Sequence, residues 1–252
     1  MVPPGPGQLE VVLRYLNDPV QLADAVLLAR ETIRSVARAH SLKALFIPKY
    51  DMMKAGNGLH VHLSIIDRTT GRPIFSDGAS RLSIQGSAFV EGILRHLPAL
   101  MGVTMPSTNS FRRLGAGCWT GFAVGWAFED KEAGIRVCYG DLATQEWTNV
   151  EFKFCDSSCN LYMGLAGILA CGLNGIAEEL TLRPPLSADA TLTEPPPASL
   201  QEALKCLEKD ELLNSTLGLS LMKGHLALRR NEAERAANMT LEDEIKEWLA
   251  RA

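Results

Sequence analysis

The sequence predicts an α+β protein in which short strands alternate with long helices. Two observations support this prediction. Several short segments alternate between apolar and polar side chains, which is the period of a half-buried strand. Between them lie longer segments whose apolar side chains recur at helical spacing. The polar faces of the strands carry carboxylates, imidazoles and basic groups, so we expect the functional chemistry there.

Composition limits the classes of partner. The 252-residue chain is long enough to bury a large core, in one large domain or two small ones. Its composition, 46% hydrophobic and 21% charged, is typical of a soluble globular protein. A net charge of −4 gives no general attraction to nucleic acid or to an anionic membrane, and no apolar run reaches the length of a bilayer span. We therefore expect neither nucleic acid nor membrane as a partner.

Targeting and redox features favour the cytoplasm. The first residues lack the basic and apolar regions of a signal peptide. The six cysteines form no C-x-x-C pair, so structural zinc is not expected. Without a secretion signal we interpret them as reduced thiols.

An alternating segment at residues 8–15 predicts the first strand. Its aliphatic residues define one face, and Glu10 lies on the other. Taken alone, Glu10 is most simply a solvated or arginine-paired edge residue. A helix is predicted to follow as far as about His40, with Asp18 as N-cap and Pro19 at the first helical position.

The segment 55–64 holds the most informative pattern. The glycine turn at 56–58 contains residues that tolerate positive φ, so the backbone can turn tightly and pass close to a ligand. In the strand that follows, aliphatic residues face one way and His60, His62 and Ser64 the other. A single strand histidine is more often structural. Two on one face beside a glycine turn suit metal or phosphate binding.

Two adjacent arginines follow the next predicted elements of the chain. We expect a short strand at 43–50, a hairpin turn at 67–71 and a helix at 83–100. The loop that follows contains the adjacent Arg112 and Arg113. By itself it is a solvated loop, but beside a strand with two histidines it is interpreted as an anion clamp.

Further strands are predicted after the glycine-rich loop 115–121. They cover residues 122–128 and 135–138, and the second contains Arg136. A last strand at 149–154 places Glu151 and Lys153 on its polar face. This pair is either a surface ion pair of small worth or a metal ligand beside a substrate-carboxylate clamp.

The remaining segments predict helices. A closely packed helix rich in Gly and Ala is expected at 158–180, and the prolines at 183–198 predict a stiff connection. A capping box at Ser199–Glu202 opens another helix. The charged segment from about residue 220 is expected to pack outside the core.

Four motifs in this order resemble the catalytic domain of glutamine synthetases. They are Gly5-Pro-Gly-Gln-Leu-Glu10, Gly56-Asn-Gly-Leu-His-Val-His-Leu-Ser64, Asn109-Ser-Phe-Arg-Arg-Leu114, and Glu151-Phe-Lys-Phe followed by Asp156-x-x-x-Asn160. The resemblance covers nearly the whole chain. Its details around Cys118-Trp-Thr-Gly are most similar to the class I-like, FluG-type branch.

This resemblance implies a fold and a reaction. The fold is a curved, barrel-like, largely antiparallel sheet with helices outside, with residues 1–252 as one catalytic domain. In the reaction, ATP phosphorylates the side-chain carboxylate of glutamate, and ammonia displaces the phosphate to give glutamine. The resemblance also implies Mg²⁺ or Mn²⁺ as cofactor, for which carboxylates and one imidazole are suitable ligands. A homo-oligomer is implied for the full-length form.

The resemblance also implies a role for each matching residue. The metal ligands fall on Glu10, His60 and Glu151. The nucleotide-binding positions fall on His62, Ser64 and Lys131. The glutamate-binding positions fall on Gly56, Arg113 and Lys153. The catalytic arginines, which hold the substrate carboxylate and stabilise phosphoryl transfer, fall on Arg113 and Arg136.

Several positions depart from the family pattern. Trp119 stands where the family has a glutamate that helps deprotonate ammonium, which leaves room for another amine such as a polyamine or an aromatic amine. Ala55 replaces an asparagine. Lys131, Asn149 and Lys153 replace arginines, and a lysine keeps the charge but loses the planar fork.

The family's N-terminal β-grasp domain and first catalytic strands are expected to be absent from this chain, together with a pair of metal-binding glutamates. We therefore expect weak or no synthetase activity from the isolated chain. A non-catalytic relative that acts through oligomerisation is the main alternative. A metal-dependent hydrolase built on His60 and His62 would need further strand ligands, whereas His40, His96 and His225 all fall in predicted helices.

Overall fold

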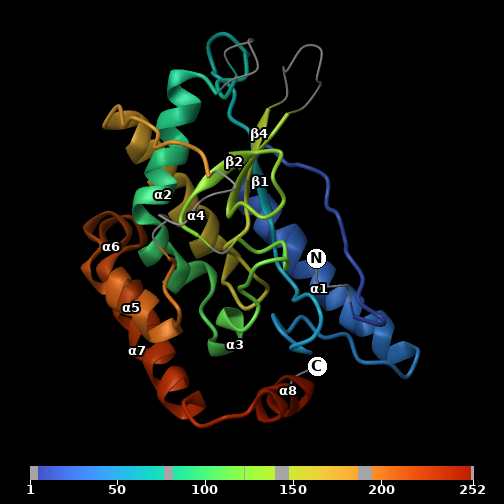
Figure 1. The fold of residues 1–252 in the computed structure, drawn as a ribbon. Helices are drawn as coiled ribbons and strands as arrows, with labels where there is room; N and C mark the ends of the chain where they lie inside the picture. Colours follow the sequence, from blue (N-terminus) through green and yellow to red (C-terminus); the bar gives the residue numbers. More distant parts are fainter. Residues whose placement is uncertain (1–4, 77–81, 122, 140–147, 187–194, 251–252) are drawn as a thin grey trace.

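The computed structural model describes residues 5–76, 82–121, 123–139, 148–186 and 195–250, and it shows a small sheet flanked by helices (Figure 1). The strands of this part of the chain are β1 (Val61–Leu63), β2 (Trp126–Phe128), β3 (Ile135–Cys138) and β4 (Asn149–Phe152). Its helices are α1 (Pro19–Ala39), α2 (Ile84–Thr104), α3 (Thr108–Phe111), α4 (Leu161–Ala177), α5 (Leu200–Lys209), α6 (Glu211–Leu217), α7 (Leu219–Ala236) and α8 (Leu241–Ala250). The predicted α+β class is confirmed.

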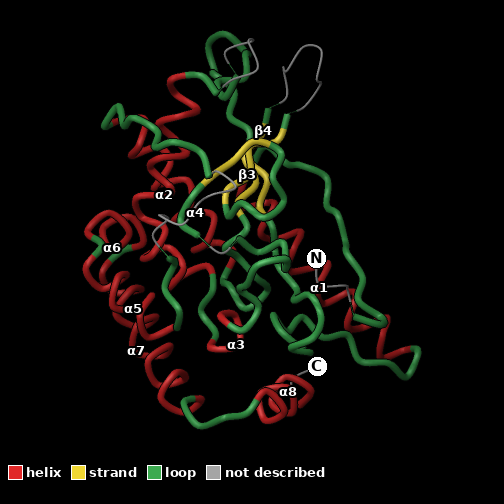
Figure 2. The backbone as a smooth tube through the Cα atoms, viewed as in Figure 1, coloured by secondary structure: helices red, strands yellow, loops and turns green. Residues whose placement is uncertain are grey.

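Strand β4 occupies a central position in the sheet, whose order is β1-β4-β3-β2. It pairs antiparallel with β1 and with β3, whereas β2 runs parallel to β3. In this register Glu151 of β4 lies opposite His62 of β1 and Arg136 of β3. The described strands form an open sheet and not a closed barrel (Figure 2).

Helices α2 and α4 pack closely against each other, and both contribute buried residues to the core. The inward residues predicted for α2 are all buried, namely Phe89, Ile93, Leu94 and Leu97. A Cβ atom at Gly92 would lie only 2.2 Å from the carbonyl oxygen of Cys171, so glycine is required where the two backbones meet. The close packing predicted for the segment 158–180 is therefore confirmed.

Local capping signals are also confirmed. Asp18 caps α1 by accepting hydrogen bonds from the backbone N–H groups of Val20 and Gln21. Ser83 also caps α2, a role that the sequence pattern had not assigned to it. Ser199 accepts from the N–H of Glu202 at 3.3 Å, as the capping box predicts. Residues 187–194 of the predicted connection and residue 122 of the predicted strand lie outside the described residues.

Residues 8–15 do not form the predicted strand. The segment is irregular, Glu10 is exposed, and Leu9 is 89% exposed. Alternation specifies the two faces of a strand, but a strand also needs a neighbour to pair with, and no described segment pairs with this one. Only its start is anchored, because the Gln8 side chain donates to the carbonyl oxygen of Gly56 at 3.0 Å and to Asn57 Oδ1 at 2.8 Å.

The segment 43–50 is likewise irregular and not the predicted strand. Its buried end is held by a side chain in place of a neighbouring strand. The N–H of Lys49 donates to Asn109 Oδ1 at 2.7 Å, and Asn109 Nδ2 donates to the carbonyl oxygen of Lys49 at 3.1 Å. An amide side chain thus supplies the pairing that a ladder would otherwise provide.

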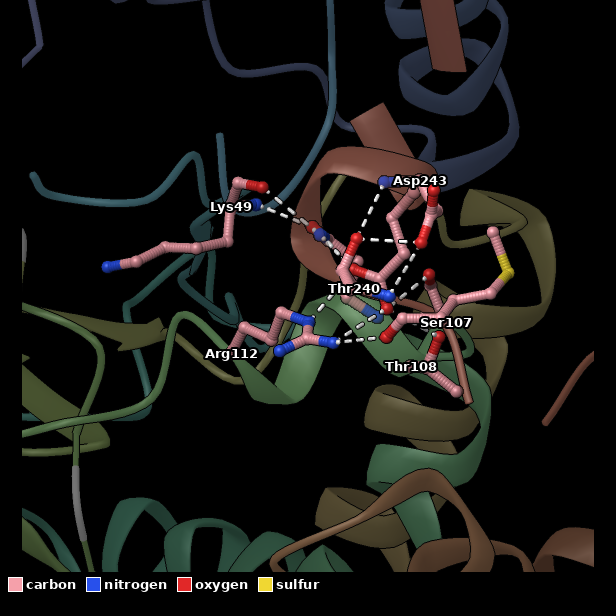
Figure 3. A network of polar contacts seen from close by, with 9 residues as sticks. Lys49, Ser107, Thr108, Arg112, Thr240 and Asp243 are labelled. Atoms are coloured by element: carbon pink, nitrogen blue, oxygen red, sulfur yellow. Dashed lines mark hydrogen bonds and ion pairs between the residues drawn. The ribbon is translucent and has the colours of Figure 1, made fainter. Parts of the chain in front are cut away.

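Helix α8 docks against α3 through the carboxylate of Glu244. This carboxylate accepts from Asn109 Nδ2 at 2.7 Å and from Arg112 Nε at 2.9 Å. Thr240 and Asp243 cap the helix reciprocally. Figure 3 shows Arg112 near Thr240 and Asp243 at the start of α8. Among the described helices, none has the length and apolar character needed to cross a bilayer.

Candidate functional site

The polar face of the sheet is organised around the carboxylate of Glu151. His60 Nδ1 lies 3.0 Å from its Oε1 atom, and His62 Nε2 lies 3.7 Å from the same atom. Arg136 Nε donates to Oε2 at 2.6 Å, and Lys153 Nζ lies 3.8 Å from Oε2. Five predicted site residues therefore come together on this face.

Strand alternation and sheet position explain this gathering. Val61, Val150 and Phe152 point into the core, as predicted, which turns the intervening residues toward the polar face. Because β4 has a neighbour on each side, Glu151 is only 5% exposed and Lys153 only 1%. The interpretation of this pair as a weak surface ion pair is therefore wrong.

The electrostatics of this face favour an ionised Glu151. Burial alone would raise its pKa, but the hydrogen bond from His60 and the charges of Lys153 and Arg136 outweigh burial and lower the pKa to about 2. Burial lowers the pKa of His60, although Glu151 opposes this effect, and burial also lowers the pKa of Lys153. Two basic side chains and two imidazoles thus lie within 4 Å of one carboxylate, so the positive groups in direct contact with Glu151 outnumber it.

The ring of His60 is oriented for a second interaction. A neutral His60 that donates from Nδ1 to Glu151 keeps a lone pair on Nε2. Metal-binding histidines commonly hold their other ring N–H on a carboxylate in this way. Gly58 makes room for the ring, because a Cβ atom there would lie 2.8 Å from Nε2.

The glycine turn serves close packing and not unusual backbone angles. Gly56 and Gly58 are absent from the described glycines that have positive φ, so the turn does not use the positive φ that these residues tolerate. A Cβ atom at Gly56 would lie 2.6 Å from Arg113 Cβ and 2.6 Å from the carbonyl oxygen of Pro48. Glycine is therefore required because the turn lies directly against Arg113.

The adjacent arginines do not form one anion clamp. Arg112 binds Glu244 on α8, away from the polar face. Arg113 is fully buried, and its Nη2 donates to the carbonyl oxygens of Lys153 at 2.8 Å and Cys155 at 2.9 Å. Its Nη1 atom has no hydrogen-bond partner among the described residues. Only Arg113 of this pair therefore belongs to the candidate site.

Two further predicted residues, Ser64 and Lys131, lie with His62 at the edge of this face. His62 contacts Asn149 Oδ1 through Nδ1 at 2.8 Å. Ser64 and Lys131 are exposed, and the carbonyl oxygen of Lys131 accepts a hydrogen bond from Lys153 Nζ. These positions leave their side chains accessible to a ligand.

Glu10 is not brought to His60 and Glu151. It lies exposed in the unpaired segment 8–15. Within the described ranges, no group of three or more His, Cys, Asp or Glu side chains is arranged to hold a metal ion. The structure thus supplies one contact, between His60 and Glu151, from the three predicted ligands.

Sequence reasoning missed three polar residues that support the site. Asp156 Oδ2 lies 3.6 Å from Arg113 Nε, and Glu132 accepts hydrogen bonds from the loop 115–121. Gln8 anchors the glycine turn, as described above. Gln8 and Asp156 lie inside the motifs quoted above, which was an available signal. Glu132 lies in a charged connection without such a signal.

The other histidines have structural partners. His96 Nδ1 lies 2.7 Å from Asp210 Oδ2, and His225 Nε2 lies 2.9 Å from the carbonyl oxygen of Gly102. Both belong to helices, as predicted, and His40 ends α1. The described strands thus offer no further imidazole to His60 and His62, which disfavours a hydrolase.

A cavity of about 490 Å³ lies elsewhere, between α1, the start of α4, α7 and α8. Its acidic side chains are already paired with arginines: Glu232 with Arg229, Glu244 with Arg112, and Glu247 with Arg235. Arg30 adds a further positive charge to the lining, but none of the residues predicted for the site lines this cavity. We therefore place the candidate site on the sheet.

Comparison with known proteins agrees with the resemblance seen in the motifs. Residues 3–248 match the family described as glutamine synthetase, catalytic domain. The glutamine synthetase of Methanocaldococcus jannaschii is 34% identical over 240 residues, covering 90% of this chain and 52% of that protein. The gamma-glutamylpolyamine synthetase GlnA3 of Streptomyces coelicolor is 33% identical, with coverage of 90% and 51%. The fluG protein of Emericella nidulans is 30% identical, with coverage of 97% and 27%.

Solved structures agree as well. A protein described as a novel glutamine synthase homolog superposes with a TM-score of 0.78 at 29% identity, covering 90% of this chain and 53% of that one. A GmaS/ADP complex gives a TM-score of 0.77 at 28% identity, with coverage of 88% and 53%. The chain spans about half the length of the curated relatives it matches.

Proposed function

This chain belongs to the glutamine synthetase family through its catalytic domain, and from that premise we propose that it acts in the cytoplasm as an ATP-dependent ligase joining a carboxylate to an amine. The default substrates are glutamate and ammonia. The observation that carries the proposal is the surplus of positive charge around Glu151. Such a face suits substrates that bear several negative charges.

The proposed reaction has two steps. Transfer of the γ-phosphoryl group of ATP to the glutamate side chain gives an acyl phosphate and ADP, because a carboxylate itself is a poor electrophile. The amine then attacks the acyl carbon, phosphate leaves, and the nitrogen loses a proton to give the amide. In this scheme Arg136 stabilises the charge on the phosphoryl group.

Substrate binding is proposed for the residues below the glycine turn. Arg113 and Lys153 would hold the substrate carboxylate, with Gly56 forming the turn above them. The buried Nη1 of Arg113 supports this role, since it has no hydrogen-bond partner among the described residues. His62, Ser64 and Lys131 would contact the nucleotide from the accessible edge of the face.

The described residues fit only part of a metal site. His60 and Glu151 would hold Mg²⁺ or Mn²⁺, whose chemistry there is to neutralise charge on the phosphates. Their contact at 3.0 Å would let Glu151 orient the ring of His60 and leave Nε2 of that ring for a ligand. Glu10 would join them only if the segment 8–15 approached the sheet. We therefore propose that the isolated chain, taken as one catalytic domain, is weak or inactive, and that further ligands come from a fuller polypeptide or oligomer.

A second candidate is a ligase for a larger amine. Trp119 favours it, because the loop 115–121 contains no acidic side chain to accept a proton from ammonium. The relative GlnA3 is described as a gamma-glutamylpolyamine synthetase, which supports the same direction. Activity with ammonium, putrescine and an aromatic amine, measured side by side, distinguishes the two candidates.

A non-catalytic relative that acts through oligomerisation is the remaining alternative. The exposed apolar side chains of residues 9–16 and of the outer face of α1 favour it. Metal-dependent ATP binding separates this alternative from a ligase, since a purely structural relative need bind no nucleotide. Titration calorimetry with ATP, with and without Mg²⁺, measures this difference.

The direct test is γ-glutamyl transfer by the purified chain with Mn²⁺. We expect weak turnover, and robust turnover would show that the chain already holds a complete site. Arg136→Gln should abolish any activity that is present. The matched control is Arg112→Gln, because Arg112 neighbours Arg113 in sequence but binds Glu244 on α8. Equal losses in both variants would contradict the assignment of the sheet face.

A further inference from the structure

The cavity between α1, the start of α4, α7 and α8 is large enough to hold a ligand of its own (Figure 1). None of the residues that line it belongs to a strand, so it is separate from the polar face of the sheet. Its volume of about 490 Å³ lies within the range found for small-molecule sites. The side chains of the lining therefore indicate which ligand it would take.

Arg30 of α1 contributes a positive charge to this lining that no ion pair neutralises. The other two arginines of the lining, Arg229 and Arg235, each pair with a glutamate. Arg30 forms no ion pair with any described residue, and its buried Nε has no hydrogen-bond partner among them. Its guanidinium lies over the ring of Phe46, with Cζ 5.4 Å from the ring centroid. Such stacking positions a guanidinium but leaves its N–H donors unused.

The surroundings of Arg30 do not compensate for its burial. Burial and the neighbouring charge of Arg34 lower the pKa of Arg30, and nearby carboxylates oppose this effect only in part. Two of those carboxylates, Glu31 and Asp156, are already paired with other arginines. A bound anion would offset the cost of burying this guanidinium.

Two further features of the lining favour an anion. Ser157 is only 8% exposed, and its hydroxyl forms no hydrogen bond with another described residue. The first turn of α4 also lines the cavity, through Leu161 and Tyr162. Because this 17-residue helix has no acidic side chain in its first turn, the positive end of its dipole is not neutralised there.

The rest of the lining is partly apolar. Val26 of α1 and Leu161 of α4 are buried residues of the core, and Trp248 of α8 also lines the cavity. An indole favours contact with another ring. One uncompensated guanidinium matches a single negative charge, and its planar fork suits a carboxylate.

We propose that this cavity binds a small carboxylic acid with an apolar, ring-bearing body. Arg30 binds the carboxylate, and Ser157 donates a hydrogen bond to it. The apolar body packs against Trp248. This site is separate from the proposed ligase site and does not depend on that function.

Phenylacetate is a suitable probe, and its binding to the purified chain is measured by calorimetry and by tryptophan fluorescence. We expect saturable binding, with the neutral phenylacetamide and the small acetate ion each at least roughly tenfold weaker. The fluorescence change should disappear in Trp248→Phe, which keeps a ring at this position. Equal affinity for the acid and its amide would overturn the proposal. So would an absence of saturable binding, or a fluorescence change that persists in Trp248→Phe.

Variants of the two polar groups test their roles. Arg30→Met should weaken phenylacetate binding roughly tenfold or more, because it removes the charged donors but keeps a long side chain. Arg30→Lys keeps the charge without the planar fork, so its affinity should be intermediate, and it remains informative if the methionine variant does not fold. Ser157→Ala should weaken binding by a smaller factor, roughly threefold. Wild-type affinity in all three variants would refute the site.

The matched control is Arg34→Met. Arg34 also lies over the ring of Phe46, at 5.3 Å, but it pairs with Glu31 and does not line the cavity. This variant should keep the wild-type affinity for phenylacetate. Lys153→Met should keep it too, because Lys153 lies at the sheet. A loss in Arg34→Met equal to that in Arg30→Met, or any loss in Lys153→Met, would place the probe outside the cavity and overturn the proposal.

Discussion

Two carboxylates of this protein are equally buried, at 5% exposure, but their surroundings differ. Glu244 on α8 is bound by a single arginine, Arg112, together with the neutral side chains of Asn109 and Thr108 (Figure 3). Glu151 on β4 faces the basic side chains of Arg136 and Lys153 and two imidazoles. Burial alone therefore does not distinguish them.

The difference separates a structural ion pair from a candidate binding site. Around Glu244 one positive charge balances one negative charge, and the pair holds α8 in place without charge left for a ligand. Around Glu151 the cations repel one another in the folded protein, and a bound anion would relieve this repulsion. Charge balance, and not burial, marks the candidate site.

The largest expected effect is on the free energy of unfolding when the Glu151 carboxylate is removed. Its folded pKa of about 2 lies below the unfolded value of 4.5, so its stabilising contribution is full above pH 4.5 and is lost as the pH falls toward 2. A pKa difference of this size corresponds to ~3 kcal/mol. Glu151→Gln should therefore lower the free energy of unfolding by about this amount at pH 7, and by progressively less as the pH falls from 4.5.

Urea unfolding at a series of pH values measures this effect. Glu242→Gln is the control, because Glu242 pairs with Lys246 on the exposed surface of α8. A loss in Glu151→Gln that is the same at pH 3 as at pH 7 would show that the ionised carboxylate is not what stabilises the face.

The second effect is the loss of stability expected when the Glu244 carboxylate is removed. Glu244→Ala removes the carboxylate that joins α8 to Arg112 and Asn109, and should lower the free energy of unfolding by about 2 kcal/mol. It should also speed amide exchange in α8 while leaving anion binding at the sheet unchanged. Glu242→Ala on the same helix should cost less than about 0.5 kcal/mol. Altered anion affinity in Glu244→Ala would mean that the two carboxylates are coupled.

The third effect is stabilisation by bound phosphate, which should depend on the cations around Glu151 and not on Arg112. At an inorganic phosphate concentration ten times its Kd, phosphate should stabilise the wild-type chain by about 1.4 kcal/mol, or roughly 2–4 °C in thermal midpoint. Lys153→Met should abolish this shift, since it removes one of the two cations beside Glu151 and so leaves no surplus positive charge there. Arg112→Met should keep it. An equal shift in both variants would place the bound anion elsewhere.

The smallest effect concerns the edge of the cluster. His62 Nε2 lies 3.7 Å from Glu151, and its side chain is 51% exposed. His62→Ala should therefore change the free energy of unfolding by less than about 0.5 kcal/mol. His60→Ala should cost more, because His60 donates a hydrogen bond to the carboxylate. Thermal unfolding of the two variants compares them, and the reverse order would contradict the geometry described for this face.

Much of the site could be predicted from local pattern. Alternation around His60 and around Glu151 correctly assigned their side chains to one polar face, because strand geometry fixes the period of two. The same reasoning failed at residues 8–15, where the alternation is equally regular. A strand forms only when another strand pairs with it, and the alternation within one segment does not show whether such a partner is present.

The sequence by itself determined the family, the helix caps at Asp18 and Ser199, and the residue types on the polar face. The caps and the strand faces depend on residues a few positions apart in the sequence, and the family is indicated by several motifs that occur in the expected order. Only the tertiary structure decided that Arg136 and Lys153 meet at Glu151, that Arg112 turns away to α8, and that Glu10 stays apart. Those outcomes depend on strand order and on packing between segments far apart in the chain, which local patterns do not encode.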